Sequence, residues 1–294
     1  MRTVEWPTLA LLAVTYALWA LATTWLATLW LPLGVVVAAL AIAQHSSLSH
    51  EALHGHPFAD ARANMAAVWP ALGLLVPYLR FRDTHLAHHR DALLTDPYDD
   101  PESNYLDPVI WARLPHVLRA ALRFNNTLIG RIAIGPIVGM TTFLRGDWRE
   151  MRAGDASIRR AWLWHGAAMV PVMIWVWAAP MPIWAYLIAA YGAMSLLKIR
   201  TFLEHRAHDR ASGRTVVIED RGLLALLFLN NNYHVVHHMH PKAPWYALPR
   251  LYARNRAHYL KRNDGYVYRS YGQIFRAHFV RAKDSVAHPL WPRP

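Results

Sequence analysis

Three clusters of histidine have the spacing of metal ligands. One has the pattern His-x-x-x-His, and two have the pattern His-x-x-His-His. Residues three and four positions apart lie on one face of a helix, so we expect the imidazoles of each cluster to converge on one point. Neutral imidazole is the commonest protein ligand of transition metals, and the sequence therefore predicts a metal centre. The clustered residues are His50, His54, His85, His88, His89, His234, His237 and His238.

These histidines suit two metal ions better than one. A zinc ion takes four ligands, usually three from the protein at a catalytic site. Iron is favoured because an all-nitrogen site with open positions suits redox iron and oxygen chemistry. The carboxylate type of diiron protein needs two Glu-x-x-His motifs, and the chain has only one, Glu51 to His54. The chain has no Cys, which excludes thiolate zinc sites and iron–sulfur clusters.

Two long apolar stretches must position these clusters. Residues 7–50 and 161–197 contain no Asp, Glu, Lys or Arg, and each stretch is long enough for two crossings of about 20 residues. Prolines near the middle divide each stretch into a hairpin. We therefore expect an all-α integral membrane protein with four transmembrane helices in two hairpins, at about 8–53 and 161–203.

The other segments are expected at the membrane surface and in the cytoplasm. Residues 64–81 would span roughly 22 Å as a helix, short of the hydrocarbon core, and contain two prolines. We interpret them as a re-entrant or interfacial piece. Residues 124–144 contain Arg131 and are interpreted as an interfacial helix. The cytoplasmic regions, 82–160 and 204–294, complete a single domain over 1–294 as a helical cap that holds the histidines.

The charge pattern favours a membrane protein over a nucleic-acid-binding one. The net charge is +12, but the cations flank membrane segments, whereas nucleic acid binding needs a soluble basic face. Cationic loops mark the cytoplasmic side, which places the histidine clusters there. The first apolar segment is too long for the core of a signal peptide, so we expect the first helix to be retained.

The sequences HEALH at 50–54, HLAHH at 85–89 and HVVHH at 234–238 resemble the three histidine boxes of the membrane fatty acid desaturase superfamily. This superfamily also includes acyl hydroxylases and carotenoid ketolases. The resemblance runs from the first hairpin to about Pro249. It implies a non-haem diiron site, O2 as co-substrate and a lipid or other apolar substrate from the bilayer. It also implies an external electron donor of ferredoxin or cytochrome type, because no such module is fused.

The resemblance implies a ninth ligand, His205, at the cytoplasmic end of the last membrane helix. Some desaturases place an Asn one turn earlier, which touches the metal through water, whereas this chain has Thr201 there. One of the consecutive asparagines Asn230, Asn231 and Asn232 could substitute for it. An Asn before a helix is more often a cap, and we favour that interpretation.

Carboxylates beside the boxes are candidates to orient the imidazoles, since a metal-bound imidazole commonly donates its other N–H to a carboxylate. A solvated acid or an Arg partner explains each of them equally well. The candidates are Glu51, Asp83, Asp91, Glu204 and Asp209. In the polar loop after the second box, Asp96, Asp99 and Asp100 are expected on the surface.

Desaturation of a lipid acyl chain is the favoured reaction, as the commonest activity in the superfamily. Hydroxylation and ketone formation stay open, because they differ from it only in substrate placement, and the run PWYALP at 244–249 also occurs in carotenoid ketolases. A membrane zinc metalloprotease would use Glu51 as base with His50 and His54 on zinc, but it leaves the other boxes unexplained. The compact, unfused chain suggests a bacterial cell membrane, with the active site facing the cytoplasm.

Overall fold

The structure is a computed structural model that describes residues 4–89 and 91–291, with only the backbone of Asp91. It is predominantly helical, as the sequence predicts. The chain divides into two compact units. One unit contains Met1–Arg82 and Ile137–Leu197, and the other contains Asp83–Pro136 and Lys198–Pro294.

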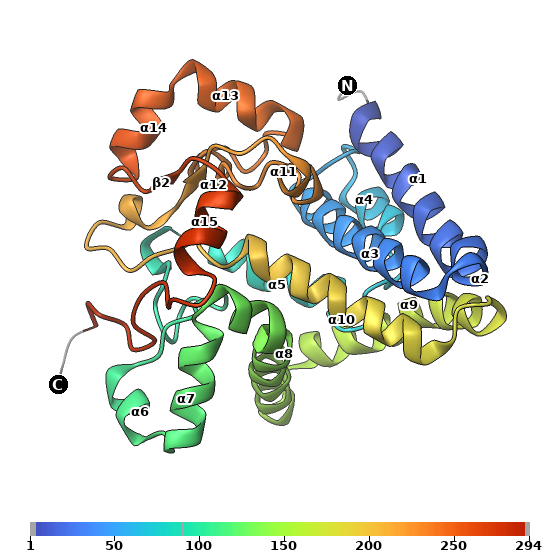
Figure 1. Cartoon of the computed structure of the whole chain (residues 1–294), viewed down its shortest axis with the longest axis horizontal. Helices are drawn as coiled ribbons and strands as arrows, with labels where there is room; N and C mark the ends of the chain where they lie inside the picture. Colours follow the sequence, from blue (N-terminus) through green and yellow to red (C-terminus); the bar gives the residue numbers. More distant parts are fainter. Residues whose placement is uncertain (1–3, 90, 292–294) are drawn as a thin grey trace. The chain divides into compact units, whose positions relative to one another are not determined.

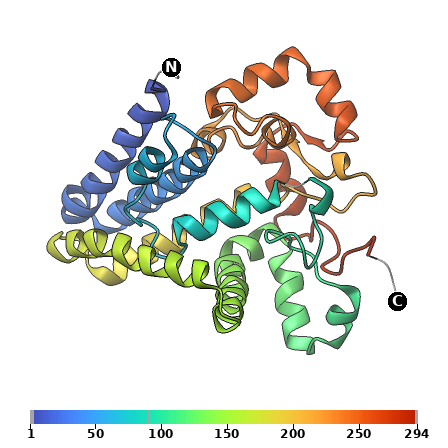
Figure 2. The same ribbon diagram turned by 180° about the vertical axis from the view of Figure 1, so that it is seen from behind.

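The first unit begins with the expected helical hairpin (Figure 1). Its first arm is α1 (Trp6–Leu21), continued by a π-helical turn (Ala22–Leu26) and α2 (Ala27–Leu29), and its second arm is α3 (Leu31–Leu53). Trp30 is extended between the arms, and a proline occupies the first turn of α3, where its missing N–H costs no helical hydrogen bond. α1 and α3 lie side by side in both views (Figure 2).

Four helices in the described part of the chain are long and apolar enough to cross a membrane, the number that the sequence predicts. They are Trp6–Leu29, Leu31–Leu53, Leu128–Arg152 (α8) and Ala156–Ala178 (α9). The set differs from the expected one in one member. Pro136 does not end α8, which runs for 25 residues through the segment expected at the interface. α10 (Ile183–Arg200), expected as a span, has 18 residues and ends with Lys198 and Arg200.

Residues 64–81 do not form one continuous helix. They include the end of α4 (Ala61–Ala67), an irregular stretch and the start of α5 (Tyr78–His88). Side chains of the long helices satisfy carbonyl groups of the irregular stretch: the Tyr186 hydroxyl donates to Leu72 O at 2.7 Å, and His165 Nε2 lies 2.9 Å from Leu74 O. These contacts satisfy backbone groups that have no helical partner in the irregular stretch. The interpretation of residues 64–81 as a re-entrant or interfacial piece stays a prediction.

The second unit builds the region that carries most of the histidines. A short parallel pair of strands, β1 (Val217–Ile218) and β2 (Val267–Tyr268), packs beside α12 (His234–Met239) and α13 (Leu248–Arg254). Val235 and Val236 of α12 are buried in an apolar core. That burial leaves the histidines of α12 to face another way. The remaining helices of the unit are α6 (Pro108–Arg113), α7 (His116–Asn125), α11 (Leu223–Leu227), α14 (Arg256–Arg262) and α15 (Tyr271–His278), with 3-10 turns at Asp91–Leu93, Ala211–Arg214 and Trp245–Ala247.

A buried carboxylate joins three segments of the first unit. Asp147 is 2% exposed; it accepts hydrogen bonds from Arg80 Nε and a terminal guanidinium nitrogen at 3.1 and 2.9 Å and from Trp162 Nε1 at 2.8 Å. Asp147→Ala is expected to lower the free energy of unfolding by about 3 kcal/mol, because breaking a buried ion pair costs that order of energy. Thermal unfolding in detergent measures it. Glu150→Ala, in an exposed pair with Arg149, is the control and should change little; an equal effect of both variants would contradict the prediction.

Candidate metal centre

Helix geometry divides each His-x-x-His-His box between two groups of ligands. His85 of α5 and His89, which directly follows that helix, have ring centroids 4.7 Å apart, whereas His88 lies 5.8 and 6.3 Å from them. At about 100° per residue, positions i and i+4 point within about 40° of each other, while i+3 turns to the other side. The expectation that all three histidines of this box converge on one point is therefore wrong.

The same division occurs in α12. His234 and His238 have ring centroids 4.6 Å apart, and His237 lies 5.8 and 6.0 Å from them. The two boxes combine crosswise: the i and i+4 pair of each box joins the i+3 histidine of the other. One group contains His85, His89 and His237, and the other contains His88, His234 and His238 together with His205.

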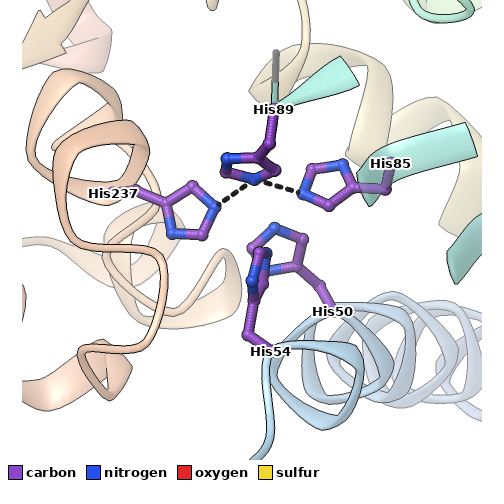
Figure 3. Close-up of side chains that lie close together, drawn as sticks. All are labelled: His50, His54, His85, His89 and His237. Carbon is purple, nitrogen blue, oxygen red and sulfur yellow. Dashed lines mark hydrogen bonds between the residues drawn. The ribbon is translucent and has the colours of Figure 1, made fainter. Parts of the chain in front are cut away.

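The first group is buried or half-buried and points its Nε2 atoms inward (Figure 3). His89 Nε2 lies 2.9 Å from His85 Nε2 and 3.1 Å from His237 Nε2. In the first unit, His50 and His54 leave the same end of α3, with ring centroids 4.8 Å apart. They are 2% and 9% exposed. Their spacing and burial suit a pair of ligands on one helix face.

The second group gathers around His205, which follows α10. Its Nε2 atom lies 2.8 Å from His88 Nε2 and 3.0 Å from His234 Nε2, and His238 Nε2 lies 3.2 Å from His234 Nε2. Two nitrogens bound at right angles to one metal at roughly 2.1 Å are about 3.0 Å apart. The nitrogen separations are therefore those of neighbouring ligands on one ion.

Carboxylates form hydrogen bonds with the Nδ1 atoms of two histidines in the second box. His88 Nδ1 lies 2.7 Å from an oxygen of Asp100, and His85 Nδ1 lies 3.0 Å from an oxygen of Glu102. An ionised carboxylate only accepts hydrogen bonds, so each Nδ1 must be the donor. In a neutral ring the Nε2 lone pair is then free for a metal. The hydrogen-bond network thus selects the tautomer that can act as a ligand.

A chain of polar side chains does the same for the third box. Arg200 Nε and Asn231 Nδ2 both donate to Glu204 Oε1, at 3.0 and 2.9 Å. This fixes the Asn231 amide so that its Oδ1 faces His234 Nδ1 at 3.3 Å. His234 must donate from Nδ1, and its Nε2 lone pair also points into the group.

The electrostatics of the second group are those of a site built for a cation. Burial disfavours a charged His88, but the charges of Glu102 and Asp100 and the hydrogen bond to Asp100 outweigh burial and raise its pKa to about 9. Burial and neighbouring histidines hold the pKa values of His205 and His234 well below their usual range. The raised pKa of His88 shows that its surroundings stabilise a positive charge, and the neighbouring neutral imidazoles offer nitrogen donors, so this donor set fits a metal cation with nitrogen ligands.

The predicted supporting acids differ in their positions. Glu204 supports the third box through Asn231, and Glu51 is buried with its carboxylate 3.8 Å from His50 Nδ1. Asp83 and Asp209 are exposed, and their supporting role stays a prediction. The side chain of Asp91 lies outside the described residues.

The prediction that Asp100 lies on the loop surface is wrong. Asp100 is 6% exposed, and it accepts hydrogen bonds from the backbone N–H groups of Thr95 and Glu102 as well as from His88. Sequence reasoning also missed Glu102. Both acids lie in a loop rich in Asp, Glu and Pro, and only its folding distinguishes them from their exposed neighbour Asp99.

The prediction that one of the three consecutive asparagines caps the helix of the third box is also wrong. The N-cap of α12 is Tyr233, without a side-chain cap bond, and the asparagine side chains bond elsewhere. Asn230 donates to Trp245 O, and Asn232 donates to Ile218 O and Asp220 O. Thr201, at the position of the water-bridged Asn, has a buried hydroxyl with no partner among the described residues.

Four histidines outside the candidate ligand set have other polar partners. His45 lies 3.1 Å from the Tyr16 hydroxyl, and His56 Nδ1 lies 2.8 Å from both oxygens of Glu5. His208 pairs with Asp264 at 3.1 Å, and His240 lies 3.2 Å from the Tyr259 hydroxyl. These contacts separate the ordinary histidines from the nine candidate ligands.

The comparison with known families agrees with the histidine pattern. The model of the fatty acid desaturase family matches residues 23–270, a range that contains all nine candidate ligands. The chain belongs to the fatty acid desaturase family. Within this family, it is similar to the β-carotene ketolase of Paracoccus sp. (strain PC1), with 28% identity over 226 residues, 75% of this chain and 74% of the ketolase. The β-carotene ketolase of Paracoccus sp. (strain N81106) is 27% identical over 225 residues, with the same coverage. The chain is therefore an oxidoreductase of the desaturase superfamily.

Proposed function

We propose that this chain is an O2-dependent membrane oxygenase that converts a ring methylene group of a carotenoid into a ketone. The observation that carries the proposal is the similarity to two β-carotene ketolases over about three quarters of both chains. The run PWYALP after the third box supports it. Desaturation of an acyl chain, favoured from the sequence alone, is the second candidate and rests on the family match.

The nine histidines are the proposed ligands of two irons. When bound, such a metal pair supplies the activation of O2 that attack on an unactivated C–H bond requires. Asp100, Glu102 and the Asn231–Glu204 pair keep their imidazoles in the ligating tautomer, and this fixes the direction of each lone pair before metal binds. The ligands in this proposal are His50, His54, His85, His88, His89, His205, His234, His237 and His238.

The apolar helices support a membrane setting for the proposed reaction. Four helices suited to a membrane favour a substrate that enters from the bilayer. An electron donor of ferredoxin or cytochrome type is the proposed redox partner, and the cationic C-terminal region favours an acidic one. A bacterial cell membrane with the histidines on the cytoplasmic side is the proposed location.

The test is carotenoid analysis in cells that make β-carotene, with iron counted in the purified protein. Cells with the wild-type chain should accumulate a product heavier by about 14 mass units per ketone, and the protein should hold about two irons. His85→Ala should abolish the product. A gain of about 16 would instead establish a hydroxylase, and an acyl chain lighter by about 2 would establish a desaturase. One zinc per chain with peptide-bond cleavage would replace the proposal by a metalloprotease.

A further inference from the structure

Two polar groups in the apolar helix α3 have no hydrogen-bond partner among the described residues. They are the hydroxyl of Ser47 and the side-chain nitrogen of Gln44, and Ser47 is 1% exposed. A buried Ser or Thr in a helix usually donates to the carbonyl four residues earlier. Ser49 does so to His45 O at 2.9 Å, and Thr15 does so to Leu11 O at 2.7 Å. The Ser47 hydroxyl does not take this bond and is available to something else.

Ser47 lies on the same face of α3 as the two histidines of the first box. Ser47, His50 and His54 are at positions i, i+3 and i+7, which share one face. Helical side chains lean toward the N-terminus, so the His50 imidazole extends over the turn that bears Ser47. The two residues are separated by about 4.5 Å along the helix axis. A group bound by Ser47 would therefore lie beside a candidate metal ligand.

The face changes character along the helix. Toward the start of α3 it carries Leu40 and Val36, which are 42% and 56% exposed. It then carries the unpartnered polar groups, and finally the histidines. An apolar molecule with one oxygen atom near its reacting end matches this order. Both unpartnered groups are N–H or O–H donors, so they suit an uncharged oxygen that accepts hydrogen bonds.

We propose that Ser47 and Gln44 hold the oxygen that the first oxidation installs on the substrate ring, so that the same carbon is presented for the second oxidation. This inference rests on the proposed function. In the first step, a ring C–H becomes C–OH, while O2 takes two electrons and two protons from a reduced redox protein and solvent and releases water. A second identical step gives a geminal diol, which loses water to leave the ketone. The alcohol must stay bound between the two steps.

The test is the ratio of alcohol to ketone that purified enzyme forms from β-carotene with O2 and a reducing donor system. Ser47→Ala and Gln44→Leu should each raise this ratio about 3- to 10-fold, as expected for one lost neutral hydrogen bond. Iron content should stay near wild type, because neither residue is a proposed metal ligand. Ser49→Ala is the matched control: its hydroxyl bonds its own helix, and its ratio should not change.

The outcomes separate this inference from the proposed function. An unchanged alcohol-to-ketone ratio in both Ser47→Ala and Gln44→Leu, with ketone still formed, would overturn the inference and leave the ketolase proposal standing. An equal rise in Ser49→Ala would also overturn it, because the effect would then come from helix packing. A wild-type enzyme that holds iron but oxidises no carotenoid would overturn the proposed function and this inference with it.

Discussion

His205→Ala is expected to lower the iron content from about two to about one per chain and to lower turnover more than about 100-fold. His205 contributes the nitrogen around which the second group gathers, with His88 and His234 at 2.8 and 3.0 Å. Loss of this nitrogen leaves the second ion with fewer ligands. A catalytic metal supplies several kcal/mol of transition-state stabilisation, and each 1.4 kcal/mol corresponds to a tenfold change in rate.

Metal analysis of the purified variant and its rate of product formation test this prediction. His208→Ala is the matched control, because His208 is close in sequence but pairs with Asp264 instead of another histidine. Its iron content and turnover should remain near wild type. Full iron content in His205→Ala would remove His205 from the ligand set and would leave the second ion with His88, His234 and His238.

Asp100→Asn is expected to weaken metal binding about 10- to 100-fold, the usual effect of losing a partner that orients a ligand. The Asp100 carboxylate accepts three hydrogen bonds, from His88 Nδ1 and from the N–H groups of Thr95 and Glu102. An amide has only one acceptor oxygen, so its NH2 group would face a donor. Either orientation of the amide leaves at least one of these donors facing the NH2 group, and the loss of the negative charge weakens the bond that keeps the proton on His88 Nδ1.

Iron retention against a chelator measures this effect. Asp99→Asn is the control, since Asp99 lies beside Asp100 in the chain but is exposed, and its retention should equal that of the wild type. Equal retention in Asp100→Asn would show that the His88 tautomer is set by another contact. A comparable loss in Asp99→Asn would attribute the effect to the charge of the loop.

The apolar helices show how far sequence reasoning reaches for the fold. Charge-free stretches of sufficient length predict a membrane protein because the hydrocarbon core admits few charges. They identify the first hairpin and α9 well. They do not decide α8, because Arg131 and Pro136 favour an interfacial helix in the sequence, whereas the helix of the structure continues through both residues. Packing in the folded chain overrides the local preference of a single proline.

The candidate ligands were accessible from the sequence, and their grouping was not. Imidazole spacing and the family motifs identify the histidines because ligand chemistry depends on residue type. The grouping depends on contacts between distant segments, such as His88 with His205, which are 117 residues apart. It also depends on the helical angle that separates His88 from His85 and His89.

The sequence by itself indicated the kind of donor atom, the family and three of the four membrane-length helices, because these follow from residue types and short spacings. Only the tertiary structure decided which acids orient the imidazoles. Asp99 and Asp100 have the same chemistry and adjacent positions, yet one is exposed and the other is buried against His88. The backbone N–H groups of Thr95 and Glu102 hold the Asp100 carboxylate beside His88, and these contacts form only when the loop folds.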